Sequence, residues 1–464
     1  MNQSLREQQL REKPIKPLFW QFSIPAITGM MVQALYNIVD RIFIGHMPQN
    51  SALAMGGLGI AMPLLFIMMG VSMLFGIGSG ANISIRLGEK DHPRAQKIFS
   101  HGLVMLAIST VLIVLIGLWQ TDPILRLFGA TERNLPFARD YLRIILIGNL
   151  WNTFAFAFTH TIRAEGSPKV AMTSMIIGAI TNTVLDPLFI FGLGMGVKGA
   201  AYATIIAQFL SFLWSLKYYL SEQSLMKIKW PSRFNAGVVL TIMAIGVSPF
   251  FIQIAGSVVG ALMNNQLKAY GGELAQSAYI AFAAITQLFF MPIFGMNQGL
   301  QPIVGFNYGA GNFSRVKQAN KFGLKVASIL TLVGWVGVML IPEFLVRLVT
   351  NDPEVIALSA EGLRIFESAM FLVGIQFISN NFFHSIGKAK ISFILSVLRQ
   401  FAIVAPLIIF LPRWFGLKGI WLSTPIADVL ATAITVYFLL KEYRLLDELQ
   451  AKKLLDTSQP ATSD

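Results

Sequence analysis

Four polar residues inside apolar runs have side chains that could bind a cation. Asp40 lies in YNIVDRIFIG, while Asn182 and Asp186 are four residues apart in NTVLDPLFIFG and therefore share one face of a helix. Thr204 lies in the next apolar run. Two acids that face one pocket can load and release a proton, because their charges repel when both are ionised. Carboxylate, amide and hydroxyl oxygens are also ligands that Na⁺ prefers, so we expect a site for H⁺ or Na⁺.

An alternative interpretation needs no function: each aspartate could cap backbone groups or pair with Arg41 or Arg163. A charge at membrane depth costs at least ~2.5 to 3.5 kcal/mol, so an acid without an obvious partner favours a functional role. Arg41 points about 100° away from Asp40 on a helix and can reach the headgroups from the outer end. The interpretation as a cation site is therefore preferred.

Other polar or adaptable side chains in the apolar runs are expected to line a substrate cavity. Gln33 and Tyr36 or Asn37 share the helical face of Asp40. Methionine-rich surfaces repack around varied ligands, which adds a methionine to the set. The residues expected to line the cavity are Gln33, Tyr36, Asn37, Asn149, Asn152, Gln208, Gln287 and Met291.

The second half of the chain carries different deep charges. Arg399 and Asp428 lie in its last two apolar runs. A base and an acid that face each other across adjacent helices lower the free-energy cost of placing both charges in lipid. A structural ion pair is therefore the preferred interpretation. A second polar site in this half remains open.

The composition predicts a polytopic membrane protein. Of 464 residues, 55% are hydrophobic and only 13% are charged, too few to cover a water-soluble surface. Apolar runs of about 20 residues predict twelve transmembrane helices. Most of the 36 Lys and Arg residues fall in segments that would be cytoplasmic if both termini were, which accounts for the net charge of +13 without nucleic acid.

An internal repeat divides the chain into halves. At a shift of 221 residues LGEKDHPRAQKIFSHGL matches YGAGNFSRVKQANKFGL, and VKGAAYAT (197–204) meets LKGIWLST (417–424) at a similar shift. Six helices per half place both halves in the same orientation, related by an axis along the membrane normal. The predicted organisation is an N-tail (1–17), an N-lobe (18–220), a cytoplasmic linker (221–235), a C-lobe (236–440) and a C-tail (441–464).

The motifs of several enzyme classes are missing. There is no cysteine, no GxxxxGK[ST] loop and no cluster of metal ligands, so we expect neither catalysis nor a cofactor nor a metal. The glycine-rich FGIGSG (75–80) ends an apolar run, which favours close helix packing over nucleotide binding. A channel or a flippase for lipid-linked oligosaccharides remains an alternative, and the flippase would need a cationic cavity.

Several of these segments together resemble the multidrug and toxic compound extrusion (MATE) family over essentially the whole chain. They are SIPAITGMMVQALYNIVDRIFIGH, FGIGSGANISIRLGEKD, RAEGSPK and NTVLDPLFIFGLGMGVKGAAYAT. Acids in predicted span one (18–45) and span five (168–192), with none in span seven (236–264), resemble the DinF-like branch, with MepA-like exporters nearby, rather than the NorM-like branch. The resemblance implies the MATE fold and assigns the acidic site to Asp40, Asn182, Asp186 and Thr204 and a bending proline to Pro25.

The resemblance also implies an activity. We expect an antiporter in a bacterial cytoplasmic (inner) membrane that exports lipophilic, often cationic compounds, with H⁺ as the preferred coupling ion and Na⁺ as the alternative. Its partners would be these small molecules and the bilayer, and we expect a monomer that binds no nucleic acid. Pro25 lies within span one, where it could let the helix that carries Asp40 bend.

Overall fold

The computed structural model describes residues 3–45, 51–132, 134–231 and 233–458, and the side chains of residues 3, 4, 37, 41, 44, 45, 51–58 and 456–458 lie outside that description. The described residues form helices, short turns and loops, and none of them forms a strand. Ten helical segments are long and apolar enough to cross a membrane. The expectation of an all-helical polytopic protein is therefore confirmed.

The chain packs as two compact units. Unit 1 comprises Met1–Arg6, Ile24–Ile83 and His92–Ile254, and unit 2 comprises Glu7–Ser23, Ser84–Asp91 and Ala255–Asp464. Most unit boundaries thus fall inside helices, and α2 (Ile15–Gly45) and α9 (Ala236–Gly309) contribute to both units. The division of the two lobes at linker 221–235 stays a prediction.

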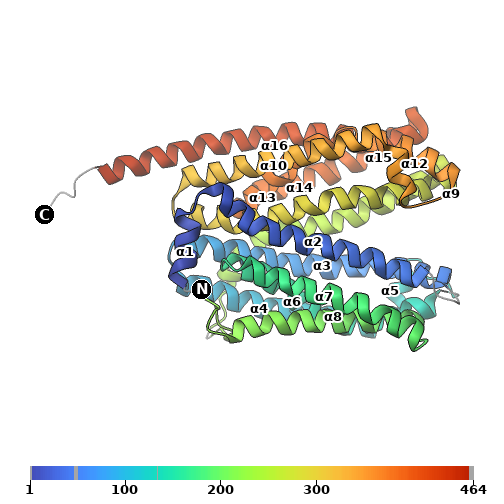
Figure 1. The fold of residues 1–464 in the computed structure, drawn as a ribbon, viewed down its shortest axis with the longest axis horizontal. Helices are drawn as coiled ribbons and strands as arrows, with labels where there is room; N and C mark the ends of the chain where they lie inside the picture. Colours follow the sequence, from blue (N-terminus) through green and yellow to red (C-terminus); the bar gives the residue numbers. More distant parts are fainter. Residues whose placement is uncertain (1–2, 46–50, 133, 232, 459–464) are drawn as a thin grey trace. The chain divides into compact units, whose positions relative to one another are not determined.

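Unit 1 contains long helices that are apolar along most of their length. In Figure 1, α4, α6, α7 and α8 run side by side. Its core contains Leu142 and Leu146 of α6 and Ala200 and Ala201 of α8. The helices that belong wholly to this unit are α4 (His92–Trp119), α5 (Thr121–Leu127), α6 (Leu135–Ala164), α7 (Pro168–Pro187), the π-helix η1 (Leu188–Gly192) and α8 (Gly196–Leu220).

Unit 2 repeats this plan with more interruptions. Its core contains Phe282 of α9, Leu363 of α12 and Trp421 of α16, all fully buried. The helices that belong wholly to this unit are α10 (Phe313–Leu340), α11 (Pro342–Arg347), α12 (Pro353–Phe366), α13 (Met370–Ser385), α14 (Ala389–Val397), the π-helix η2 (Leu398–Val404), α15 (Ala405–Phe410) and α16 (Pro412–Ser458). Helices α1 (Gln3–Glu12) and α3 (Ser51–Gly88), like α2 and α9, contribute to both units.

Three predicted spans differ from simple straight helices. Helix α9 holds the predicted seventh and eighth spans, which meet at Gly272, where φ is 64° and only glycine is unstrained. The predicted tenth span (362–386) is divided into α12 and α13 by the break at residues 367–369. The Trp335 indole nitrogen donates a hydrogen bond of 2.9 Å to the Ser368 carbonyl inside this break. The break therefore has a partner for one of its freed backbone groups.

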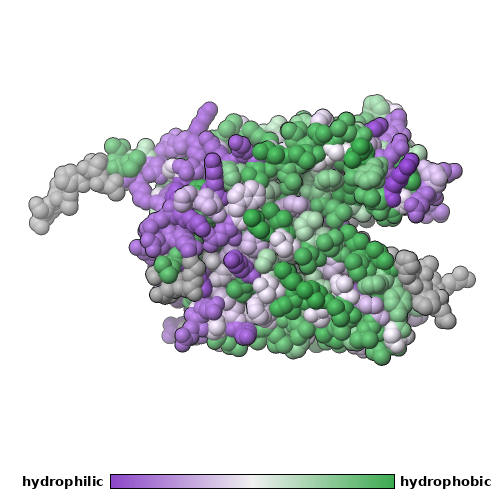
Figure 2. Space-filling view, in the orientation of Figure 1, coloured by the Kyte–Doolittle hydropathy of each residue, from purple (hydrophilic) through white to green (hydrophobic). Residues whose placement is uncertain are grey.

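The surface of each unit matches a lipid environment. Figure 2 shows hydrophobic side chains over the length of the helices and hydrophilic ones at helix ends. On α4, for example, Leu112, Leu115 and Ile116 are more than half exposed. Such residues would destabilise a water-exposed helix but are favourable against acyl chains.

The glycine-rich FGIGSG segment packs one helix closely against another. It lies inside α3, and a Cβ atom on Gly78 would come within 2.3 Å of the Ile242 carbonyl oxygen of α9. Gly246 is equally tight, because a Cβ atom there would lie 1.8 Å from the Leu74 carbonyl oxygen. Small residues at a helix interface allow such backbone approach in membranes. The segment is therefore a packing interface, and no loop for nucleotide phosphates forms here.

The Gly246→Ala substitution tests this interface. The added methyl group must push α3 and α9 apart, so we expect the free energy of unfolding to fall by about 1–3 kcal/mol. The Gly256→Ala control lies on the same helix with nothing within 4 Å of its Cβ position, so it should be neutral or stabilising. Tryptophan fluorescence during thermal unfolding in detergent measures both variants. Equal melting temperatures would contradict the close approach.

Candidate cation-binding site

The two aspartates predicted to act together lie in unit 1 and interact directly. Asp186 is fully buried near the end of α7, and Asp40 lies near the end of α2 and is partly buried. Their carboxyl groups interact through their charges and through a hydrogen bond. A hydrogen bond between two carboxyl groups requires a proton on one of them. The arrangement can therefore hold one proton between two helices.

Asn182 and Thr204 complete a polar cluster around Asp186. The Asn182 amide donates from Nδ2 to Asp186 Oδ1 at 3.1 Å and to Thr204 Oγ1 at 3.4 Å. Thr204 in turn donates to the Ala200 carbonyl oxygen at 2.9 Å, so its lone pairs face Asn182. The Asn182 Oδ1 atom is buried and accepts no hydrogen bond from the described residues. It is a free oxygen ligand beside two carboxyl groups.

The alternative that an aspartate pairs with a basic residue finds no support among the described residues, and the side chain of Arg41, one of the considered partners, lies outside them. Within the described part of the chain, Asp186 forms no ion pair, and its recorded neighbours are Asp40, Tyr36 and Asn182. Arg163, one of the considered partners, is buried on α6 and its Nε and Nη1 atoms have no hydrogen-bond partner among the described residues. Among the described residues, the environment of Asp186 is thus acidic and neutral.

The remaining predicted residues of α2 lie beside this cluster. The Tyr36 hydroxyl is hydrogen-bonded to the Gln33 side chain and is close enough to Asp40 and Asp186 to interact with both charges. Gln33 and Tyr36 are partly buried, and the side chain of Asn37 lies outside the described residues. The 3.6-residue spacing along span one therefore brings Tyr36 and Asp40 to one site.

The other residues predicted to line the cavity are more scattered. Asn149 is buried and accepts a hydrogen bond of 3.1 Å from Thr153 on its own helix, whereas Asn152 is exposed. Gln208 of α8 has a buried Oε1 atom without a donor among the described residues. Gln287 is exposed and Met291 is partly buried, and both belong to unit 2. Their roles in binding stay predictions.

Two prolines lie in the helices that carry the two aspartates. Pro187 follows Asp186 directly, and α7 changes there into the π-helix η1. A proline removes one backbone donor, and π-turns occur frequently at functional sites. Pro25 is buried inside α2, which continues through it, and the boundary between the two units falls between Ser23 and Ile24. The segment of α2 that carries Asp40 thus begins beside this proline.

A second buried polar cluster lies in unit 2. The Arg399 guanidinium donates to Asp428 Oδ1 from Nε at 2.9 Å and from Nη2 at 2.7 Å. The Glu367 carboxyl accepts a hydrogen bond of 2.7 Å from Thr286 close to this pair. Glu367 was missed in the sequence, because the predicted tenth span (362–386), in which it lies, was expected to be one continuous helix. Its only sequence signal is an acid inside a span expected to be continuous.

A third buried polar cluster lies in unit 1, at the end of α6. Glu165, in the turn after α6, is buried and accepts hydrogen bonds from the Leu225 amide at 2.7 Å, Ser224 Oγ at 3.1 Å and the Tyr218 hydroxyl at 3.1 Å. Arg6 of α1 donates to the same Tyr218 hydroxyl at 2.9 Å. Burial raises the pKa of Glu165 to about 7, while these hydrogen bonds act in the opposite direction. This carboxyl group titrates near neutral pH.

The Glu165→Gln substitution should remove a pH dependence of stability. An unfolded glutamate titrates near 4.3, so the stabilisation from neutral Glu165 is complete below that pH and disappears as pH rises through about 7. The wild-type protein should therefore lose up to about 3 kcal/mol between pH 4.5 and 7.5 from this group. Thermal unfolding at both pH values, with Glu222→Gln as an exposed control, measures the difference. An unchanged pH slope in Glu165→Gln would sink this assignment.

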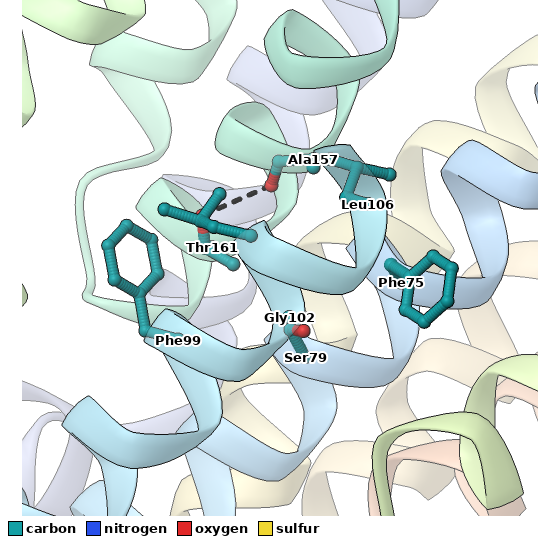
Figure 3. Close-up of a pocket in the computed structure, with 8 residues that line it drawn as sticks. Phe75, Ser79, Phe99, Gly102, Leu106, Ala157 and Thr161 are labelled. Carbon is teal, nitrogen blue, oxygen red and sulfur yellow. Dashed lines mark hydrogen bonds between the residues drawn. The ribbon is translucent and has the colours of Figure 1, made fainter. Parts of the chain in front are cut away.

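The small cavity in unit 1 is not a substrate site. Figure 3 shows Gly102 of α4 facing Ser79 of α3, with Phe75, Phe99 and Thr161 around them. The cavity has a volume of about 10 Å³, which is room for about one water molecule. Gly102 is required here, because a Cβ atom would lie 2.3 Å from Ser79 Oγ. The residues are therefore helix-packing residues.

Comparison with known proteins places these features in context. The MatE family model matches residues 25–188 and 238–410. The chain is 26% identical over 449 residues to the multidrug export protein MepA of Staphylococcus aureus, an alignment that covers 96% of this chain and 98% of that protein.

Solved structures give the same result. A multidrug resistance MATE family transporter of the MOP superfamily, solved in an outward-facing conformation, has a TM-score of 0.89 and 26% identity over 95% of this chain and 98% of its own. A MOP superfamily transporter from Pyrococcus furiosus has a TM-score of 0.88 and 25% identity over 95% of this chain and 98% of its own.

Proposed function

Because this chain belongs to the MatE family, whose members are membrane transporters and not enzymes, we propose that it is a proton-coupled antiporter for multidrug efflux. The observation that carries the proposal is the direct interaction of Asp40 with Asp186 beside Asn182 and Thr204. Its substrates are lipophilic, often cationic compounds, consistent with the multidrug export named for its relatives.

Competition between proton and substrate couples the two fluxes. With the site open to the outside, a proton binds at Asp40 and Asp186 and neutralises charge that would attract a cationic substrate, so the substrate leaves. With the site open to the inside, the proton is lost to the cytoplasm and substrate binds again. Exchange requires only that proton and substrate compete for the site or bind preferentially to opposite states of the protein. It requires no energy source beyond the proton gradient. The two lobes alternate access by a rocking motion.

The same oxygens could instead hold Na⁺. Two carboxyl groups, the free Asn182 Oδ1 and Thr204 Oγ1 form a set that a hard cation accepts. We favour the proton because the carboxyl groups already share a hydrogen bond, which needs no cation. Export in Na⁺-free medium separates the two ions.

A lipid-linked oligosaccharide flippase is the second candidate and receives less support. Such a protein needs basic groups to hold a pyrophosphate. The described polar groups around Asp186 are acidic or neutral, and Arg399 is neutralised by Asp428. The charge of both clusters therefore favours a cationic substrate over an anionic one.

The Pro25→Ala substitution tests whether α2 must bend during transport. Alanine restores a backbone donor and a straighter, stiffer helix, so we expect export to fall several-fold while protein levels stay unchanged. Efflux of ethidium from cells that express either form, normalised to membrane protein, gives the comparison. Pro63→Ala on α3 is the matched control, since that proline also lies inside a helix. Unchanged export by Pro25→Ala would exclude a hinge.

The proposed location is a bacterial cytoplasmic membrane with both termini in the cytoplasm, where the excess of Lys and Arg lies. A direct test uses bacteria that lack their own major efflux pumps. Cells that express this chain should accumulate less ethidium, and a protonophore should abolish the difference in Na⁺-free medium. Accumulation that responds only to external Na⁺ would replace the proton by Na⁺, and no change in accumulation would contradict efflux altogether.

A further inference from the structure

The loop that joins α8 to α9 exposes large aromatic side chains beside basic ones. It reads KIKWPSRFN over residues 227–235. The side chains of Trp230 and Phe234 are 79% and 63% exposed, and those of Lys229 and Arg233 are exposed as well. Exposed apolar side chains gathered in one place mark an interaction surface. The proposed transport mechanism uses none of these residues.

The backbone of this loop is fixed to unit 1 on both sides of Trp230. The Gln96 side chain of α4 donates to the Lys227 carbonyl oxygen at 2.7 Å and accepts from the Lys227 amide at 2.8 Å. Further along the loop, the Asn235 amide donates to His101 Nε2 at 3.0 Å. The exposed side chains between these anchors are therefore presented by an ordered backbone, which lowers the entropic cost of binding a partner.

The loop is continuous with the lipid-facing surface of unit 1. It lies beyond the end of α8 (Figure 1), and Leu220, the last residue of that helix, is 72% exposed. Phe234 precedes the first residue of α9, Ala236, by two positions. Leu240, which is also mostly exposed, lies about 6 Å further along the helix axis. Tryptophan is enriched at the boundary between acyl chains and headgroups, so the loop lies at headgroup depth.

The charge of the loop defines the partner. The sequence contains no acid between Glu222 and Glu273. Lys229 and Arg233 form neither an ion pair nor a hydrogen bond with a described residue. Both side chains are donors that bind phosphate oxygens, and each basic residue near an anionic membrane surface strengthens association about fivefold. A zwitterionic lipid would use only the aromatic residues, and free phosphate only the basic ones.

The segment that follows the last span, residues 441–455, provides an internal comparison. It contains four basic and three acidic residues, so its charges largely cancel. Its single aromatic residue, Tyr443, is buried, and Asp447 pairs with Lys317 of α10 at 2.6 Å. This segment thus packs onto its own unit. The combination of unpaired bases with exposed aromatic residues distinguishes the loop between α8 and α9 from it.

We propose that this loop is a binding surface for a phospholipid with an anionic headgroup. The lipid phosphate lies against Lys229 and Arg233, and the upper part of its acyl chains lies against Trp230 and Phe234. Bound lipid attaches the segment between the two halves of the sequence to the membrane surface and stabilises the folded chain by mass action. The site is independent of the acidic cluster and of whether the chain exports drugs.

Dioleoyl phosphatidylglycerol is the probe, and dioleoyl phosphatidylcholine is the zwitterionic comparison. Titrated into the purified full chain in detergent micelles, the first anionic lipid should bind at least fivefold more tightly than the first zwitterionic one, as counted by native mass spectrometry. Lys229→Gln/Arg233→Gln should weaken binding of the anionic lipid at least fivefold and remove this preference. Its melting temperature without lipid should equal that of wild type, because neither side chain has a partner to lose.

Two further variants separate this surface from general attraction to a basic protein. Lys441→Gln/Arg444→Gln removes two exposed bases from α16 and should leave the affinity unchanged. Trp230→Ser should weaken binding of both lipids several-fold. Equal affinity in wild type and Lys229→Gln/Arg233→Gln, or an equal loss in the α16 variant, would overturn the proposal. Protection against thermal unfolding by sodium phosphate as strong as that by phosphatidylglycerol would indicate a free-anion site and would also overturn it.

Discussion

An Asp40→Asn variant is expected to reach the membrane at wild-type levels and to lose proton-driven export by at least tenfold. Asparagine keeps the size and polarity of the side chain but cannot bind or release a proton. Asp186, its carboxyl partner in unit 1, then has no second acid with which to share one. Asp186→Asn should give the same loss. Dye export by proteoliposomes that contain equal amounts of each purified variant measures the effect.

Asp140→Asn provides the matched control for both variants. Asp140 is a half-exposed acid of the same unit, paired with Lys198 at 3.1 Å, and its removal should leave export within a factor of two of wild type. The double variant Asp40→Asn/Asp186→Asn should be no worse than either single variant, because the two acids act as one site. Additive losses, or normal export by a well-folded Asp40→Asn protein, would contradict a shared site.

The Arg399→Met substitution is expected to produce the largest loss of stability. Removal of the guanidinium leaves Asp428 buried without its base, close to Glu367. Breaking a buried ion pair from one side costs about 3–5 kcal/mol. The loss should be smaller at pH 5 than at pH 7.5, because protonation neutralises the orphaned acid. Thermal unfolding at both pH values measures it.

A second variant distinguishes loss of the pair from loss of packing. Arg399→Met/Asp428→Leu removes both charges, so most of the stability should return. In the exposed pair Lys418 and Glu361, by contrast, Glu361→Gln should cost less than about 1 kcal/mol. A double variant as unstable as Arg399→Met alone would indicate that Arg399 supports unit 2 by its aliphatic stem and not by its charge.

The acidic cluster could be predicted because its signals are local and periodic. Asn182 and Asp186 are four residues apart on a helix, and the structure joins them by a 3.1 Å hydrogen bond. The same spacing argument predicted that Tyr36 and Asp40 share one face of the first span. The proximity of Asp40 to Asp186, on different helices, was inferred from the free-energy cost of leaving either acid without a partner in lipid. Few arrangements of the helices avoid this cost.

Other features depend on packing that no local pattern encodes. Asn152 and Gln287 lie in the same kind of apolar run as Asn149, yet both are exposed, because helix rotation is decided by neighbouring helices. Glu367 escaped notice because a continuous helix was expected where α12 and α13 are separate. The hydrogen-bonded partners of Glu165 come from residues 53 to 60 positions further on, a separation at which sequence carries no pairing signal.

The most direct test of proton-coupled export is simultaneous recording of proton and substrate movement. Proteoliposomes with an acidic interior in Na⁺-free buffer should take up a fluorescent lipophilic cation and lose internal protons at the same time. Both signals should vanish in Asp40→Asn and Asp186→Asn and persist in Asp140→Asn. Uptake that requires a Na⁺ gradient, or that proceeds without proton loss, would contradict the account.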